Sequence, residues 1–261
     1  MDVKNLLKNG ELLKARELLI QEVKRSPSDI FKRMLLFEVL SFCGEWEKAK
    51  KHLDILEVQN VDIELHKDLI NSEIERYNVF NCNTTPAFLP EELPAYAIQL
   101  QNLLELLKDK NINEAKLIIK KIDTEHNTVQ ASVNNKEITT FKNSDTLLSR
   151  FLEVFVYGNY ILIPFESIEE LNISKPKSFI DLLWISAEIR LTNKMLINAY
   201  LPVLYPFSYK NERDMIKLGR ETQWTQDDNF YKGMGQHVFE IDDDQIAILE
   251  INKAVFKTES Y

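Results

Sequence analysis

The sequence has few of the residues that cross-link a chain or give it unusual backbone freedom: two cysteines and six glycines in 261 residues. Cys43 and Cys82 lie 39 positions apart, which matches no metal-binding or redox motif, so we expect two reduced, semi-buried cysteines of a cytoplasmic protein. The N-terminus lacks the apolar segment of a secretion signal. Long apolar runs are also missing, since the longest, 151–165, is broken by polar residues, a glycine and a proline. We expect no membrane span.

An excess of positive charge is absent too. The formal net charge is −9, with 32 Lys and Arg against 41 Asp and Glu, and both halves of the chain are acidic. Binding to a phosphate backbone requires a basic face, so nucleic acid is not an expected partner.

Patterns for metal, cofactor or covalent chemistry are missing as well. None of the four histidines has a partner at a recognised ligand spacing, so neither a metal nor a cofactor is predicted. The carboxylates 242–244 lack the alternation, glycine and distal glutamate of a calcium loop, and are interpreted as a hairpin turn. Gly233 and Gly235 precede a strand-like segment instead of a helix. They therefore predict a bend or a close backbone approach and not a dinucleotide loop.

What the sequence does contain is a repeat near its start. Three positions recur with a shift of 34, the length of a tetratricopeptide repeat, and a weaker third copy begins at Lys110. In such helix pairs, glycine ends the first helix and alanine allows close approach of the second. Stacked pairs form a surface that binds peptides or helices of other proteins. The recurring residues are Gly10, Leu12 and Ala15, then Gly44, Trp46 and Ala49.

Helical periodicity continues to about residue 80, with Asp29 as a candidate N-cap. The proline-containing segment 81–94 is interpreted as a linker. Two further helices are predicted at 93–107 and 112–122. Residues 1–125 are therefore predicted to form a tetratricopeptide-like helical repeat domain.

Beyond residue 126 the pattern changes to hairpins. Apolar segments flank short polar turns at 134–136, 192–194 and 242–244. Residues 160–165 are rich in strand formers, and 145–156 has the pattern of an amphipathic helix. We predict an α+β fold, in which a smaller α+β domain with antiparallel hairpins, 126–261, follows the helical one.

The later half resembles the ImpE-like accessory proteins of bacterial type VI secretion systems, also called TagJ or SciE. The matching segments keep the order and intervals of that family over almost the whole chain, and Gly44-x-Trp46-x-x-Ala49 fits its N-terminal part. They are 141–145, Leu152-Glu153, 158–165, 180–184, Leu201-Pro202, Tyr205-Pro206, Leu218-Gly219-Arg220-x-Thr222-x-Trp224 and Tyr231-x-Gly233-x-Gly235-Gln236.

This resemblance implies a cytosolic, non-enzymatic adaptor. Its partner would be the small (VipA-like) subunit of the contractile sheath, bound through a helix near the N-terminus of that subunit. An indirect link to the ClpV-type unfoldase is also implied. Aligning the repeats on a concave binding face predicts the contact residues as Phe31, Met34, Glu38, Ser41 and Phe42, with Leu100 and Leu104 from the third helix pair.

Two other functions stay open at this point. The α+β domain could hold a hydrolase site built from Asp145, Arg220 and His237, which would require the three side chains to converge. The chain could instead be a self-assembling scaffold. A partner bound on the α+β domain is a further possibility.

Overall fold

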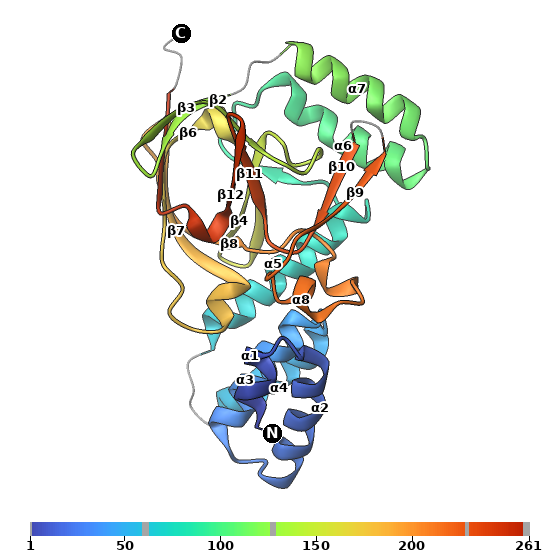
Figure 1. Cartoon of the computed structure of the whole chain (residues 1–261), viewed down its shortest axis with the longest axis vertical. Helices are drawn as coiled ribbons and strands as arrows, with labels where there is room; N and C mark the ends of the chain where they lie inside the picture. Colours follow the sequence, from blue (N-terminus) through green and yellow to red (C-terminus); the bar gives the residue numbers. More distant parts are fainter. Residues whose placement is uncertain (1, 59–62, 126–128, 228–229, 258–261) are drawn as a thin grey trace.

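The computed structural model describes residues 2–58, 63–125, 129–227 and 230–257. It combines an N-terminal helical region with a large, strongly curved sheet (Figure 1). Buried apolar residues from α1 through to the last strand make one continuous core. No described helix is both long enough and apolar enough to cross a bilayer.

The helical periodicity of the N-terminal part is confirmed, and its helices α1 to α5 contact one another in chain order. Asp29 caps α3 by accepting a hydrogen bond from the Lys32 amide at 3.1 Å. Gly10 and Gly44 end α1 and α3 with left-handed φ angles of 78° and 68°. The helices are α1 (Val3–Lys8), α2 (Leu12–Arg25), α3 (Ile30–Phe42), α4 (Trp46–Val58) and α5 (Glu64–Phe80).

A second helical hairpin follows, formed by α6 (Ala95–Lys108) and α7 (Ile112–Glu125), as predicted. Figure 1 places it beside the sheet and away from α1–α4. The segment between α5 and α6 is more than a linker. It contains β1 (Ala87–Phe88), which pairs in parallel with β5 of the main sheet.

The main sheet has the order β1-β5-β4-β8-β7-β6-β13-β2-β3-β11-β12, and all its pairings except β1–β5 are antiparallel. The three predicted hairpins are present as β2–β3, β7–β8 and β11–β12. The strands not yet given are β2 (Val129–Val133), β3 (Lys136–Asn143), β4 (Phe151–Val156), β5 (Asn159–Pro164), β6 (Ile168–Ile173), β7 (Trp184–Leu191), β8 (Leu196–Pro202), β11 (Val238–Ile241), β12 (Asp244–Ala247) and β13 (Lys253–Phe256).

Smaller elements complete the chain. The separate ribbon of β9 (Gln223–Asp227) and β10 (Phe230–Met234) projects toward α6, and the short helix α8 (Asp214–Lys217) precedes it. The described residues also include the single-turn 3₁₀ helices η1 (Phe165–Ser167), η2 (Ile180–Leu182), η3 (Ser208–Lys210) and η4 (Ile248–Glu250).

The prediction of an amphipathic helix over 145–156 is wrong. Residues 145–150 form turns, and 151–156 form β4. Asp145 accepts a hydrogen bond from the Leu147 amide at 3.0 Å, a local turn that competes with helix formation. The β4 side chains are aromatic or β-branched for the most part, which suits a strand buried on both faces.

Two smaller predictions are confirmed. Asp242 lies in the β11–β12 turn with φ of 54°, where its carboxylate accepts hydrogen bonds from Thr139 and Thr140. The backbone at Gly233 approaches a neighbour closely, because an added Cβ would lie 2.4 Å from the Tyr205 ring. The predicted boundary near residue 126 lies outside the described residues, and the division into 1–125 and 126–261 stays a prediction.

Candidate partner-binding surfaces

The predicted contact residues on α3 divide into an exposed and a covered group. Phe31 is 88% exposed, and Met34 and Glu38 are half-buried one and two turns further along. Ser41 is buried and donates its hydroxyl to the Phe37 carbonyl at 3.0 Å. Phe42 packs against Phe179, with ring centroids 4.6 Å apart. The C-terminal end of this face is therefore occupied by the chain itself, and its accessible part lies at the start of α3.

Glu38 lies where the accessible part of α3 meets the segment around η2. Burial and the nearby charge of Asp181 raise the pKa of Glu38 to about 7. The Asp181 carboxylate accepts hydrogen bonds from the amides of Lys177 and Ser178, which hold it in place. The α3 face therefore has a carboxyl group whose charge depends on pH near neutrality.

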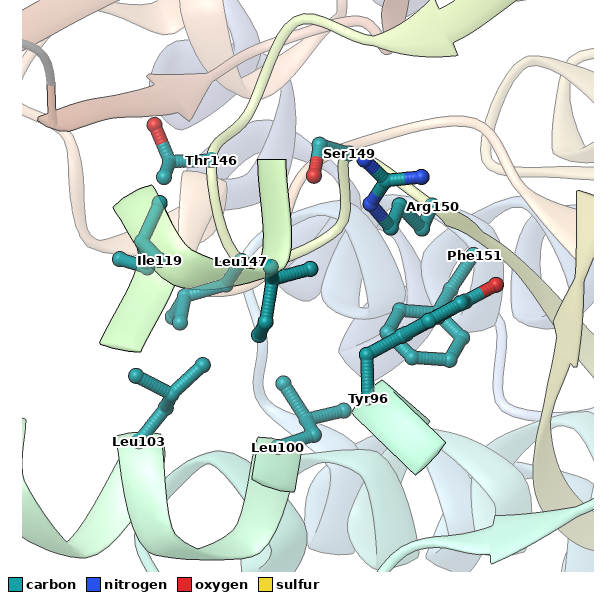
Figure 2. Close-up of a pocket in the computed structure, with 10 residues that line it drawn as sticks. Tyr96, Leu100, Leu103, Ile119, Thr146, Leu147, Ser149, Arg150 and Phe151 are labelled. Atoms are coloured by element: carbon teal, nitrogen blue, oxygen red, sulfur yellow. The ribbon is translucent and has the colours of Figure 1, made fainter. Parts of the chain in front are cut away.

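The two predicted residues on α6 are buried within the protein. Leu100 and Leu104 are 2% and 4% exposed. Figure 2 shows Leu100 and Leu103 of α6 and Ile119 of α7 pointing toward Leu147 in the turn before β4. The remaining space between them is about 20 Å³, so this seam is packed and attaches the α6–α7 hairpin to the sheet.

A larger cleft opens at the C-terminal end of α6. Its volume is about 340 Å³, within the range of roughly 300–1,000 Å³ typical of ligand sites. Apolar side chains dominate its lining, and Leu147 borders both this cleft and the packed seam. The lining consists of Phe80, Asn81, Leu104, Leu107, Lys108, Asp145, Leu147, Leu148, Pro206, Phe207, Phe230, Lys232 and Gly233.

The wall of this cleft is fixed by hydrogen bonds that backbone amides donate to a buried carboxylate. Asp145 accepts from the amides of Leu147 and Gly233, each at 3.0 Å, and so joins the turn before β4 to β10. Thr146 and Tyr231 exchange two further hydrogen bonds across the same junction. Burial raises the pKa of Asp145 to about 6, although hydrogen bonds from backbone amides, that of Gly233 first, oppose this. The cleft is thus formed before any ligand arrives.

The first turn of the repeat receives side chains from the segment around α8. Arg220 donates to the carbonyls of Leu7 and Lys8 at 2.6 and 2.7 Å, which satisfies the open C-terminal end of α1. Asp214 accepts from the Leu13 amide at 3.0 Å and caps α2. At Gly10, an added Cβ would lie 2.4 Å from the Met215 sulfur.

The equivalent turn one period later receives Tyr209. An added Cβ on Gly44 would lie 2.3 Å from the Tyr209 ring, and Trp46 contacts the same ring edge-on at a centroid distance of 5.9 Å. Trp46 also packs against Trp184 of β7. Both repeat turns therefore serve as internal contacts with the second half of the chain.

A buried ionic network connects α5 to the sheet. The Arg76 guanidinium donates two parallel hydrogen bonds, each of 2.7 Å, to the Glu153 carboxylate of β4. The Tyr160 hydroxyl donates to Glu153 at 2.8 Å. Burial raises the pKa of Glu153, but Arg76 and His237 outweigh it and bring that pKa to about 2. The pair is therefore ionised over the whole physiological range.

His237 extends this network. Its Nε2 lies 3.0 Å from Glu153, and its Nδ1 lies 3.0 Å from the Asn143 amide nitrogen. Burial lowers the pKa of His237, so the ring is neutral, donating through Nε2 and accepting at Nδ1. The Tyr205 hydroxyl donates to the Asn143 carbonyl oxygen at 3.0 Å. Every one of these groups is buried and has a partner, which is the pattern of a structural network.

The three residues suggested for a hydrolase site do not converge. Asp145 lines the cleft and Arg220 binds the end of α1. His237 shares the neighbour Asn143 with Asp145 but does not line the cleft, and both of its ring nitrogens have partners within the protein. Among the described residues, no group of three His, Cys, Asp or Glu side chains is placed to hold a metal ion.

Sequence reasoning missed the cleft and the Arg76–Glu153 pair. The pair joins residues 77 positions apart, and neither has a local pattern that points to the other. Two signals for the cleft are present in the sequence: Leu104 lies in the predicted third helix pair, and Asp145 has one of the carboxylates suggested for a hydrolase site.

Comparison with known proteins agrees with the predicted resemblance. Residues 135–255, which include most of the sheet and the β9–β10 ribbon, match the family model described as ImpE protein. This stretch has the ImpE pattern, and the ImpE-like resemblance is confirmed.

Among individual proteins, the chain is similar to the type VI secretion system accessory component TagJ of Pseudomonas aeruginosa. The two are 26% identical over 98% of this chain and 92% of TagJ. The crystal structure of protein VPA1032 from Vibrio parahaemolyticus has the same fold, with a TM-score of 0.89, 24% identity and 98% of both chains covered.

Proposed function

We propose that this chain is a non-enzymatic, cytoplasmic accessory component of a type VI secretion system. The observation that carries the proposal is the alignment with TagJ along almost the full length of both proteins. A shared full-length architecture favours a shared role more strongly than a match to one segment would.

In this proposal the partner is an N-terminal helix of the small sheath subunit. The N-terminal helices, as a tetratricopeptide-like module within residues 1–125, offer the accessible start of α3. Phe31 supplies the apolar anchor, Met34 an adaptable neighbour, and Glu38 a charge that sets the register. Ser41 and Phe42 lie buried further along α3 and support this surface from inside the protein, whereas Leu100 and Leu104, buried on α6 away from it, are not part of the docking place. A link to the ClpV-type unfoldase would be indirect, through the sheath.

The lack of convergence among Asp145, Arg220 and His237 supports a binding role over a hydrolase. The self-assembling scaffold is the remaining alternative. It predicts oligomers of the chain alone, whereas the adaptor predicts a complex that forms only with the sheath subunit.

Co-purification of the full chain with the small sheath subunit, followed by size-exclusion chromatography with light scattering, tests the proposal. We expect a complex with the full subunit and none with a subunit lacking its N-terminal helix. Equal recovery of both forms would remove the helix from the proposal, and recovery of neither would contradict the adaptor role.

A further inference from the structure

The cleft beside α6 has positive charge that the protein itself does not neutralise. The chain has a net charge of −9, yet Lys108 of α6 and Lys232 of β10 line the cleft. Within the described part of the chain, neither lysine forms an ion pair with a carboxylate. The acidic residue of the lining, Asp145, is 5% exposed, and its carboxylate oxygens accept hydrogen bonds from the amides of Leu147 and Gly233. An anion that enters the cleft therefore has two lysines available to it.

Aromatic rings form part of the wall of this cleft. Phe80, Phe207 and Phe230 all line it. The Phe207 ring lies edge-on to the rings of Phe80 and Tyr77, at centroid distances of 6.4 and 5.8 Å, which hold it in place. The Lys232 ammonium lies 5.4 Å from the centroid of the Phe207 ring, within the distance of a cation–π contact. One available cation is thus placed beside an aromatic surface.

The backbone at Phe207 is unusual for a bulky residue. Its φ is 66°, in the left-handed region that large side chains rarely adopt. The Phe207 side chain is half-buried at the cleft and is not among the buried residues of the core. Backbone outliers of this kind are concentrated at ligand sites and switch regions, where the surrounding structure holds them. The conformation of Phe207 therefore supports a binding role for the cleft.

The size and lining of the cleft suit a small molecule. Its volume of about 340 Å³ lies in the lower part of the range of ligand sites, roughly 300–1,000 Å³. Such sites are mostly apolar and contain a few polar or charged groups that orient the ligand. Leu104, Leu107 and Leu148 supply aliphatic surface here, next to the phenylalanines and the two lysines. The lining thus has the composition of a site for an apolar molecule with one anionic group.

We propose that this cleft binds a small aromatic carboxylate. The ring of the ligand packs against Phe207 and the leucines, and its carboxylate pairs with Lys232, while Lys108 adds a second positive charge. This activity is separate from the docking of a sheath helix at α3, and it does not depend on the proposed function.

The test compares two probes of similar shape, naphthoate and the neutral naphthylmethanol, by isothermal titration calorimetry with the full chain. We expect naphthoate to bind at one site per chain and about fivefold more tightly than the alcohol, because two exposed lysines each contribute a modest attraction. The preference should decrease as salt is added. Absence of saturable naphthoate binding at millimolar concentration, or equal affinities of the two probes, would overturn the proposal.

Removal of the two lysine charges locates the site. In K108Q/K232Q, the affinity for naphthoate should fall about fivefold, to that of naphthylmethanol, while the affinity for the alcohol stays unchanged. Misfolding would weaken both probes and cannot produce this pattern. The matched control K8Q/K51Q makes the same change of net charge at exposed lysines on α1 and α4 and should keep the preference for naphthoate. If K108Q/K232Q keeps the preference, or both double variants lose it equally, the cleft is not the site.

Discussion

Arg76 of α5 and Glu153 of β4 form a bidentate ion pair that is buried on both sides, with both hydrogen bonds at 2.7 Å. The pair attaches the last helix of the N-terminal array to the sheet. Arg76 also donates to the Leu204 carbonyl at 2.9 Å, so one guanidinium connects three segments.

Removing one partner of this ion pair should destabilise the folded protein. We expect Glu153→Ala to lower the free energy of unfolding by about 3 kcal/mol, because the buried Arg76 loses its bidentate partner and keeps only the Glu73 carboxylate, 3.5 Å away. Urea denaturation measures the change. Glu137→Ala is the matched control, since it removes the exposed ion pair with Lys257 and should cost no more than about 1 kcal/mol. Equal losses in the two variants would contradict a special role for burial.

Gly44 should tolerate no side chain. Gly44→Ala introduces a methyl group at a left-handed φ of 68° and within 2.3 Å of the Tyr209 ring. Gly158→Ala has a similar φ of 78° but only a 3.2 Å contact with a flexible carboxylate of Asp68, so it isolates the backbone effect. We expect the free energy of unfolding to fall by about 1–2 kcal/mol in Gly158→Ala and by clearly more in Gly44→Ala. Thermal or urea unfolding distinguishes them, and similar values would show that Tyr209 moves aside freely.

Glu38 should make stability depend on pH. Its pKa is about 7 in the folded protein against an ordinary value near 4.5, so the folded state binds the proton more tightly. The contribution of this carboxyl to stability is complete below about pH 4.5 and is lost as the pH rises to about 7. The free energy of unfolding of Glu38→Gln, measured relative to that of the original protein, should therefore rise by roughly 1–3 kcal/mol as the pH goes from acidic to mildly alkaline. A difference that stays constant with pH would contradict this account.

The exposed part of α3 should contribute to partner binding if the sheath helix docks there. Phe31→Ala with Met34→Ala is expected to weaken binding of a labelled sheath-subunit peptide by about 2 kcal/mol or more. Ile98→Ala is a suitable control, because Ile98 is an exposed apolar residue on α6. Unchanged affinity in a folded double variant would exclude this surface.

The local features of the fold were largely predictable from the sequence. The 34-residue spacing of Gly10 and Gly44 predicted helix ends, and polar turns such as 192–194 predicted hairpins, because both depend on residues close together in the chain. The prediction for 145–156 was wrong because its apolar spacing suits a helix. A tertiary hydrogen bond from Gly233 to Asp145 instead fixes the start of the segment as turns, and pairing with β5 and β8 makes 151–156 a strand.

The surfaces were harder to predict, since exposure depends on which distant segments meet. Phe42 has the same apolar character as Phe31, yet Phe42 is buried in the core, where it packs against Phe179, while Phe31 is exposed. The cleft beside α6 is built from five stretches of the chain. No single stretch of sequence describes it.

The contacts of α8 and η3 with the two repeat turns have a consequence for dissecting the protein. Arg220 and Asp214 bind helix ends more than two hundred residues earlier in the chain, and Tyr209 covers the turn at Gly44. In an isolated N-terminal fragment, the C-terminal carbonyls of α1 would lose the Arg220 guanidinium, and the surfaces at Gly10 and Gly44 would be exposed to water. In interaction screens, such a fragment would bind other proteins through surfaces that the intact protein keeps covered. Partner sites should therefore be mapped with point substitutions in the full chain.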